Sequence, residues 1–205
     1  MAKRSYVSPQ RAAAAAETRG RIIDAAIGIL RDGDIASFSL DAVGKAAGVT
    51  RLTVYNQFGS RGRLLETVFD EIAAAGGLQR LQDATTNPDG RAGIDQLIDI
   101  FCAFWGSDRA VARLHDAMAM DEELAHALRA RNERRRSGIG TLIDRIVGSR
   151  ASDSARNETV DLIFGLTSCA MYHMLAGARS ADAVAKLIRQ AAADAIDRLA
   201  RAPSR

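Results

Sequence analysis

The stretch SLDAVGKAAGVTRLTVYNQFGSRGRLL, residues 39–65, decides how the N-terminal part of this chain folds. It holds two short helical patterns, and Gly48 between them suits a helix that ends in the left-handed conformation. Ser39 and Thr50 stand directly before the two helices, where a hydroxyl can accept a hydrogen bond from the first turn. These signals predict two helices joined by a tight turn, the helix-turn-helix that sets one helix in the major groove of DNA.

The second helix of the pair has a polar outer face. Val54 and Phe58 lie one helical turn apart and form its inward stripe. The remaining side chains that face out or sideways are Arg51, Thr53, Tyr55, Asn56 and Gln57. Such a mixture suits phosphates and base edges in a major groove. We therefore predict that the segment from Arg51 to Gln57 reads DNA.

Arginines stand at two helix starts, where they oppose the helix dipole. Arg51 follows the predicted cap Thr50, and Arg61 and Arg63 lie in the first turn of a helix that Ser60 would cap. Each such cation costs roughly 0.3–1 kcal/mol unless an anion lies nearby. A DNA phosphate removes this conflict, because helix N-termini and arginines both attract it. The alternative is that these arginines are exposed and screened by salt; the adjacent turn favours phosphate binding.

The region around this motif is similar to a known family. Residues 19–69 resemble the DNA-binding region of the TetR/AcrR family of bacterial transcriptional regulators. The run GVTRLTVYNQFGSR, residues 48–61, resembles the family's pattern of Gly-Val-Ser, a threonine with an apolar residue, Tyr, two polar residues, Phe and a basic residue. The chain departs at Gln57, where the family often has His, at Gly62, where it often has an acidic helix former, and at Gly44, where it usually has Ala.

The resemblance also implies roles for single residues. It implies phosphate contacts by Thr50, Tyr55 and Arg61, and base reading at or near Arg51, Thr53 and Asn56. The full predicted DNA-binding set is Ser39, Thr50, Arg51, Thr53, Tyr55, Asn56, Gln57 and Arg61.

Composition agrees with a helical, intracellular protein. Apolar residues make up 47% of the 205 residues and there are only 3 prolines, which favours helices. The start MAKRSYVSPQ lacks the apolar core of a signal peptide, so we expect the protein in the cytoplasm. The two cysteines make a disulfide framework or a zinc cluster unlikely, and the three histidines show no metal-ligand spacing. We predict no metal and no cofactor.

The positive charge lies in the DNA-reading segment. Residues 1–70 contain 10 Lys and Arg against 7 Asp and Glu, a balance of +3, whereas residues 71–205 contain 18 of each. This excess is modest, but it has the sign and the location that attraction to a polyanion requires.

The fold class that we predict is all-α. Residues 1–18 form a flexible basic arm with an alanine-rich helix extension, and residues 19–69 form a three-helix DNA-binding domain that contains the helix-turn-helix. Residues 70–205 form a larger helical domain for ligand binding and dimerisation. The turn signal Asn87-Pro-Asp-Gly divides a connector region from the helices that follow. A long helix opens at Asp121, and we interpret its run Arg134–Arg136 as a solvated face.

Two C-terminal segments predict a homodimer. Residues 159–178 are apolar nearly all round, which by length alone also fits a membrane span. Asp161 and His173 are too polar for a lone span, so we favour one helix buried both by its own core and by a partner subunit. Residues 181–201 are amphipathic, with an apolar stripe that includes Leu187 and with Asp–Lys or Asp–Arg pairs at i,i+4 spacing on the far face. Both helices would meet their copies across a two-fold axis, which also resembles the family's dimer.

Bulky side chains of the larger domain offer a pocket for a small, largely apolar effector. The candidates are Phe101, Phe104, Trp105, His115, Met118, Phe164, Tyr172 and His173. Apolar walls with a few polar groups are typical of ligand sites, but plain core residues have the same composition. Trp105, the only Trp of the chain, is the strongest single candidate.

Two other classes of protein compete with a DNA-binding regulator. An enzyme would need a phosphate-binding glycine loop, a nucleophile elbow, a paired-histidine metal motif or a dinucleotide fingerprint, and the sequence contains none of them. A helical adaptor, or a small-molecule-binding protein without specific DNA binding, stays open as the alternative. The resemblance implies repression as the more common mode, with activation as the alternative, so we expect a dimeric repressor that a small, largely apolar effector releases from a palindromic operator.

Overall fold

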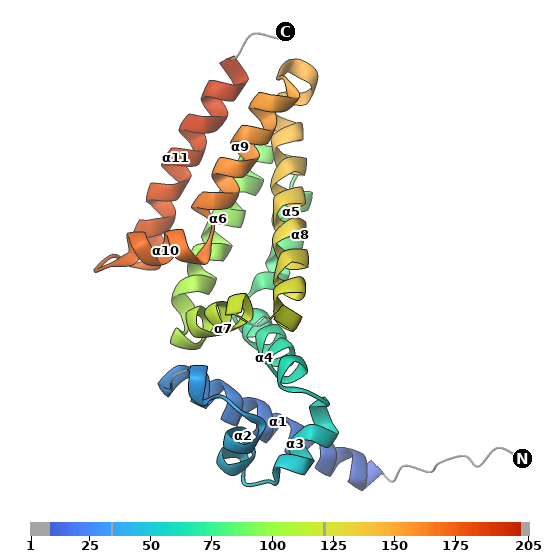
Figure 1. Ribbon diagram of the computed structural model, residues 1–205. Helices are drawn as coiled ribbons and strands as arrows, with labels where there is room; N and C mark the ends of the chain where they lie inside the picture. Colours follow the sequence, from blue (N-terminus) through green and yellow to red (C-terminus); the bar gives the residue numbers. More distant parts are fainter. Residues whose placement is uncertain (1–8, 34, 121, 202–205) are drawn as a thin grey trace, which may run out of the picture. The chain divides into compact units, whose positions relative to one another are not determined.

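Helices joined by short turns make up the fold over the residues that the structure describes. This computed structural model describes residues 9–33, 35–120 and 122–201, and every α- or 3₁₀-element within them is shown in Figure 1. The all-α class predicted from the sequence is confirmed. The chain divides into two compact units, one that ends at Asp70 and one that begins at Glu71.

The first unit is a small helical domain. Its elements are α1 (Pro9–Asp32), η1 (Ile35–Ser37), α2 (Leu40–Ala47), α3 (Arg51–Phe58) and the greater part of α4 (Arg61–Ala75). Pro9 opens α1, a position where its fixed φ and missing N–H suit a helix, and the alanine-rich run that follows is helical as expected. Residues 1–8 of the predicted arm lie outside the described residues. The core is built from Ile22, Leu30, Phe38, Val43, Val54, Phe58, Leu64, Leu65 and Val68.

The second unit is a larger helical domain built around α6. Its elements are η2 (Leu78–Arg80), α5 (Leu81–Thr86), α6 (Gly90–Ser107), α7 (Arg109–Met120), α8 (Glu122–Val147), η3 (Gly148–Arg150), α9 (Asp153–Leu166), α10 (Cys169–Ala176) and α11 (Ala181–Arg201). Helix α6 packs against α5, α8 and α11, and α9 packs against α8 and α11, so these long helices lie side by side (Figure 1). The predicted turn at Asn87 separates α5 from α6, and Asp89 caps α6 by accepting hydrogen bonds from the backbone N–H groups of Arg91 and Ala92.

The apolar stretch 159–178 is not one helix, so that prediction was wrong. Helix α9 ends at Leu166, α10 begins at Cys169, and the two axes are bent by 56°. The reason is local: Ser168 is extended, and its hydroxyl accepts a hydrogen bond from the N–H of Met171 at 3.2 Å, which starts a new helix. In the described part of the chain no single helix is long and apolar enough to cross a membrane, although α9 and α10 taken together would pass by length and composition.

Helix α11 has the predicted bounds, but one side chain of its predicted stripe lies elsewhere. Leu187 is 46% exposed, whereas Ile188, Ala192 and Ile196 are buried. The stripe therefore turns further around the helix than the sequence pattern predicted. Helix α8 is described from Glu122 onward, and Asp121, its predicted first residue, lies outside the described residues.

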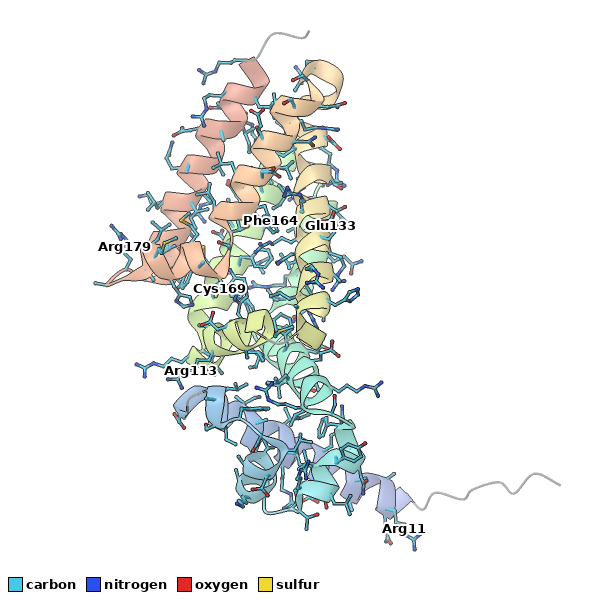
Figure 2. The ribbon with its side chains drawn as sticks, in the orientation of Figure 1. Arg11, Arg113, Glu133, Phe164, Cys169 and Arg179 are labelled. Atoms are coloured by element: carbon cyan, nitrogen blue, oxygen red, sulfur yellow. The ribbon has the colours of Figure 1, made fainter. Side chains whose placement is uncertain are left out.

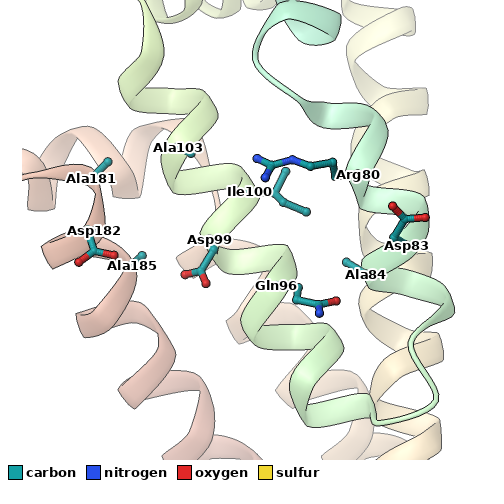
Figure 3. A pocket seen from close by; sticks show the side chains of 10 residues that line it. All are labelled: Arg80, Asp83, Ala84, Gln96, Asp99, Ile100, Ala103, Ala181, Asp182 and Ala185. Carbon is teal, nitrogen blue, oxygen red and sulfur yellow. The ribbon is translucent and has the colours of Figure 1, made fainter.

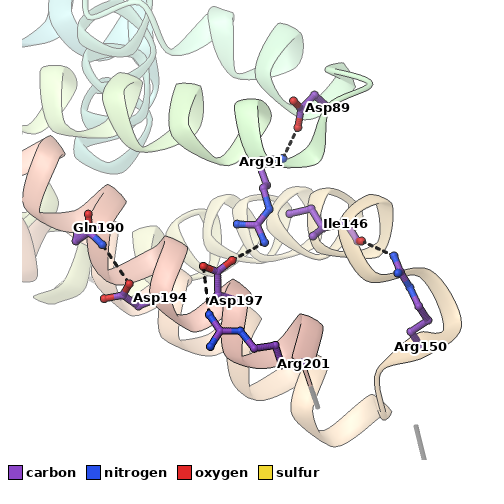
Figure 4. Close-up of polar contacts among 8 residues, drawn as sticks. All are labelled: Asp89, Arg91, Ile146, Arg150, Gln190, Asp194, Asp197 and Arg201. Carbon is purple, nitrogen blue, oxygen red and sulfur yellow. Dashed lines mark hydrogen bonds and ion pairs between the residues drawn. The ribbon is translucent and has the colours of Figure 1, made fainter. Parts of the chain in front are cut away.

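Polar contacts join α11 to α6 at the end of the unit that holds the α11 C-terminus (Figure 4). Asp197 pairs with Arg201 one turn later at 3.7 Å, as the i,i+4 spacing predicted, and also with Arg91 of α6 at 2.6 Å. Asp194 accepts a hydrogen bond from Gln190 at 3.1 Å. Exposed pairs of this kind contribute about 0–1 kcal/mol each, so they set the register of α11 more than its stability.

Candidate functional site

The helix-turn-helix forms with the caps that its sequence predicted. The Ser39 hydroxyl accepts a hydrogen bond from the N–H of Ala42 at 3.1 Å, and the Thr50 hydroxyl accepts one from the N–H of Thr53 at 3.1 Å. Between them Gly48 is left-handed, with φ 68°, as expected. The N–H of Val49 then donates to the carbonyl of Gly44 at 2.9 Å, which closes the end of α2. Each helix therefore begins and ends at a defined residue.

Gly44 lets the turn pack closely against α2. A Cβ at this position would lie 3.0 Å from the carbonyl oxygen of Val49, a contact tighter than nearly all real Cβ contacts. The glycine that departs from the family pattern is thus matched to the close approach of the turn in this chain.

Helix α3 presents three of its predicted reading residues to solvent. Arg51 and Asn56 are exposed, and Tyr55 is 54% exposed, whereas Val54 and Phe58 are buried below them. Thr53 and Gln57 are only partly exposed, and the Thr53 hydroxyl lies 2.9 Å from that of Thr50. The predicted inward stripe is confirmed.

Leu52 also lies on the exposed side of α3 and was not among the residues predicted to read DNA. Its side chain is 65% exposed, a larger exposed fraction than that of Tyr55 on the same helix. It precedes buried Val54 by two residues, and two residues correspond to about 200° of helical rotation, so the spacing alone could have placed it outward. An exposed apolar side chain beside polar ones can contact a thymine methyl group.

Two arginines hold the ends of the helices by hydrogen bonds within the unit. Arg19 of α1 donates from Nη1 to the carbonyl of Gln57 at 3.3 Å, and its guanidinium lies 4.4 Å from the ring centre of Phe58. Arg61 donates from Nε to the carbonyl of Phe38 at 3.2 Å. The predicted phosphate contact of Arg61 stays a prediction, but the structure adds this second, internal role.

The first turns of α3 and α4 carry no acidic residue. Ser60 caps α4 as predicted, because its hydroxyl accepts a hydrogen bond from the N–H of Arg63 at 3.1 Å. Both helix starts thus combine the backbone N–H groups of a first helical turn with arginines, an arrangement that attracts an anion such as a phosphate.

The larger unit brings several predicted pocket residues together in its interior. Trp105 is the centre of this aromatic cluster, with ring centres 5.9 Å from Phe101, 4.9 Å from Phe104 and 5.8 Å from His115. Its indole Nε1 donates to the carbonyl of Thr167, at the break between α9 and α10, at 3.0 Å. Burial lowers the pKa of His115, which favours the neutral imidazole.

The other predicted pocket residues are distributed differently. Met118 is fully buried in α7, and Phe164 reaches inward from α9 (Figure 2). Tyr172 and His173 form a separate edge-to-face pair with ring centres 5.3 Å apart. Tyr172 is buried, whereas His173 is exposed, so His173 does not line the interior cluster.

Arg135 points into the aromatic cluster, and its predicted place on a solvated face was wrong. Its guanidinium lies 4.1 Å from the ring centre of Phe164 and 5.2 Å from that of Phe101. Nη1 donates to the Thr167 carbonyl at 3.0 Å, so Trp105 and Arg135 share one acceptor. Arg134 is exposed, as predicted. Arg135 precedes buried Ile139 by four residues, and this spacing is the signal that could have placed it inward.

A separate groove of about 640 Å³ lies between α6, the η2–α5 segment and the start of α11 (Figure 3). Three carboxylates line it, from Asp83, Asp99 and Asp182, together with Arg80 and Gln96. None of the eight predicted pocket residues lines this groove. Its acidic lining differs from the apolar character expected of the effector site.

Helices α9, α10 and α11 each expose one large apolar side chain. Leu162 of α9 is 43% exposed, and Leu187 of α11 is comparably exposed. Met174 of α10 is 72% exposed. Apolar residues of this size on neighbouring helices are typical of a surface that a partner covers.

Known proteins resemble this chain at two levels: a family model matches part of the first unit, and solved structures share the fold of most of the chain. Residues 22–68 match the family of bacterial regulatory proteins, tetR family. No curated protein sequence matches the chain. A TetR-like transcriptional regulator from Rhodococcus sp. RHA1 has a similar structure, with 17% identity and a TM-score of 0.70 over 88% of this chain and 96% of that one.

Two further solved structures share the fold. One is NalD of Pseudomonas aeruginosa, described as the secondary repressor of the MexAB-OprM multidrug efflux pump, with 18% identity and a TM-score of 0.63 over 89% of this chain and 96% of that one. The other is SmeT in complex with triclosan, with 18% identity and a TM-score of 0.64 over 87% and 91% of the two chains. The family match falls on the helix-turn-helix itself, so residues 22–68 carry the DNA-binding domain of the tetR family of bacterial regulatory proteins.

Proposed function

We propose that this protein is a transcriptional repressor that binds operator DNA through α3. The observation that carries the proposal is the exposed face of α3, which follows a capped turn. Arg51, Tyr55 and Asn56 are exposed on this helix, whose opposite side is buried. A guanidinium and an amide are the groups that read guanine and adenine edges in the major groove. The excess of positive charge in residues 1–70 supports the same surface. The protein acts by binding, not as an enzyme, and operates in the cytoplasm, where the chromosome lies.

We further propose a homodimer through α9, α10 and α11. The exposed side chains of Leu162 and Leu187 support this face, because burying both against a second copy removes apolar area from water. A two-fold dimer carries two α3 helices, so the operator would be a near-palindrome with half-sites about 34 Å apart or a multiple of that distance.

A small effector that binds the larger unit would release the DNA. The aromatic cluster around Trp105 supports this step, as does the solved complex of a structural neighbour with triclosan. An effector needs only a preference for the conformation that does not bind DNA: a tenfold preference weakens operator binding by about 1.4 kcal/mol.

A DNA titration tests the proposal against its alternative, a helical adaptor. Fluorescence anisotropy with duplexes from the region upstream of the gene, at two salt concentrations, should show one tight site whose affinity falls steeply with salt. Asn56→Ala should remove the preference for that site. If every duplex binds equally weakly and the variant behaves like the unaltered protein, the chain is not a sequence-specific regulator.

A further inference from the structure

We propose that the larger unit recognises a small carboxylate with an apolar body, and that Arg135 is the counter-ion of this ligand. The inference rests on the proposed function, since it names the chemical class of the effector. It is carried by the position of one guanidinium inside the aromatic cluster.

Arg135 is held in place from three sides. Phe164 and Phe101 flank its guanidinium, at 4.1 Å and 5.2 Å from the ring centres. Nη1 is fixed by the Thr167 carbonyl at 3.0 Å. Phe164, which reaches from α9 toward α8 in Figure 2, forms the nearer wall. The side chain is therefore preorganised, and a ligand would meet a charge that is already oriented.

One edge of the guanidinium has no partner. Nε is buried and donates to no acceptor, and no described residue accepts from Nη2 of Arg135. Nε and Nη2 together form the side edge of the guanidinium, the fork that binds both oxygens of a carboxylate. Among the described residues, Arg135 donates one hydrogen bond, from Nη1 to Thr167, and this bond leaves the fork unused.

No carboxylate of the described residues pairs with Arg135. The neighbouring Arg136, by contrast, pairs with Asp161 of α9. Burial lowers the pKa of Arg135 to about 10, yet the guanidinium stays charged at neutral pH. A buried charge without a counter-ion is costly, and an anion that completes the pair recovers that cost on binding.

Arg135 is the group of the aromatic cluster that would bind the carboxylate of the ligand. The indole N–H of Trp105 is already bonded to Thr167, so Trp105 offers its ring and not a donor. Phe101 and Trp105 stack at 5.9 Å and provide apolar walls. The groove described above has three carboxylates and one guanidinium in its lining, so it suits an anion less well than the aromatic cluster does.

The test compares a carboxylate with its neutral amide on the full-length protein. Octanoate and benzoate are titrated beside octanamide and benzamide, with the emission of Trp105, the only Trp, and calorimetry as two readouts. We expect each carboxylate to bind about tenfold more tightly than its amide, or better, because only the anion pairs with the fork. Equal affinity for acid and amide, or no saturable binding of either acid, would overturn the proposal.

Variants on α8 separate Arg135 from the general charge of the helix. Arg135→Met should lose the preference for carboxylate over amide, and Arg135→Lys should retain only part of it, because an ammonium has no fork. Arg134→Met is the matched control: it removes the same charge from an exposed neighbour and should leave the preference intact. Circular dichroism verifies that each variant folds. If Arg135→Met does not fold, the comparison of acid with amide on the unaltered protein tests the proposal. An Arg135→Met protein that folds and still prefers the acid would contradict the assignment.

Operator binding, measured separately, distinguishes this inference from the proposed function. A carboxylate that binds at Arg135 without changing operator affinity supports the inference and refutes release by this effector. If the protein binds its operator normally but shows no binding of carboxylates, the result supports the proposed repressor function and refutes the inference about Arg135.

Discussion

Arg19 and Gln57 lie 38 residues apart and are joined by a hydrogen bond from the Arg19 Nη1 to the Gln57 carbonyl at 3.3 Å. The same guanidinium covers the ring of Phe58, the last residue of α3. Helix α1 therefore holds the C-terminal end of α3, while the Thr50 cap holds its N-terminal end. A helix of only eight residues is marginal by itself, so these contacts at both ends define how it is presented.

Arg19→Met should lower the free energy of unfolding by about 1 kcal/mol, from the lost hydrogen bond and cation–π contact. Thermal denaturation without DNA measures this loss. Arg11→Met is the matched control, because Arg11 is exposed on the same helix, and it should leave the melting temperature unchanged. An Arg19→Met protein as stable as the control would show that the contact contributes nothing to the fold.

Asn56→Ala should cost about 1–3 kcal/mol of specific operator binding and relax the preference at one or two base pairs. Non-specific binding at low salt should change little, because the amide is neutral. Competition with operators altered at single positions measures the effect, and Gln79→Ala, which removes an exposed amide from η2, serves as the control. If the preference at every position survives the change, α3 does not read bases through Asn56.

Leu187→Glu should shift the protein from dimer toward monomer, because a carboxylate cannot be buried in an apolar interface without a partner. Sedimentation at micromolar concentration gives the mass directly. Gln79→Glu adds the same charge at an exposed position of η2 and should leave the dimer intact. Two proteins that sediment alike would place the interface elsewhere.

Cys102 and Cys169 should resist alkylation in the folded protein. Burial raises the pKa of each thiol to about 11, so at pH 8 only about one thiol in a thousand is the reactive thiolate. Because the folded pKa lies above the ordinary value, reactivity should stay low through neutral pH and rise only as pH approaches 11. Mass spectrometry after iodoacetamide should show labelling of both thiols in denaturant and of neither without it. Rapid labelling of the folded protein at pH 8 would show that these side chains are accessible.

The helix-turn-helix could be predicted from the sequence because its signals are local. Ser39, Gly48 and Thr50 each act within four residues, so the caps and the turn follow from residue types alone. The buried positions Val54 and Phe58 follow from helical spacing. The roles of Arg19 and Arg61 could not be predicted, because their acceptors lie 38 and 23 residues away.

The larger unit was predicted less completely. Its composition gave no clear sign of the break between α9 and α10 or of the inward position of Arg135. Residues 159–178 are mostly apolar, and this pattern concealed the start of α10 at Cys169 although Ser168 carries a capping side chain. Three consecutive arginines indicate a solvated face, but successive helical residues are about 100° apart, so the three cannot all face one way. Arg135 is the one that shares its face with Ile139 and Leu142.

The shared acceptor at Thr167 has a consequence for the order in which the protein folds. Its carbonyl joins side chains that are 62 and 32 residues away in the chain, and contacts over such separations form only after long loops have closed. The corner between α9 and α10 therefore depends on helices α6 and α8 having already docked. We expect the amides around this corner to gain protection late in refolding, after those of α6, when hydrogen exchange is followed by pulse labelling.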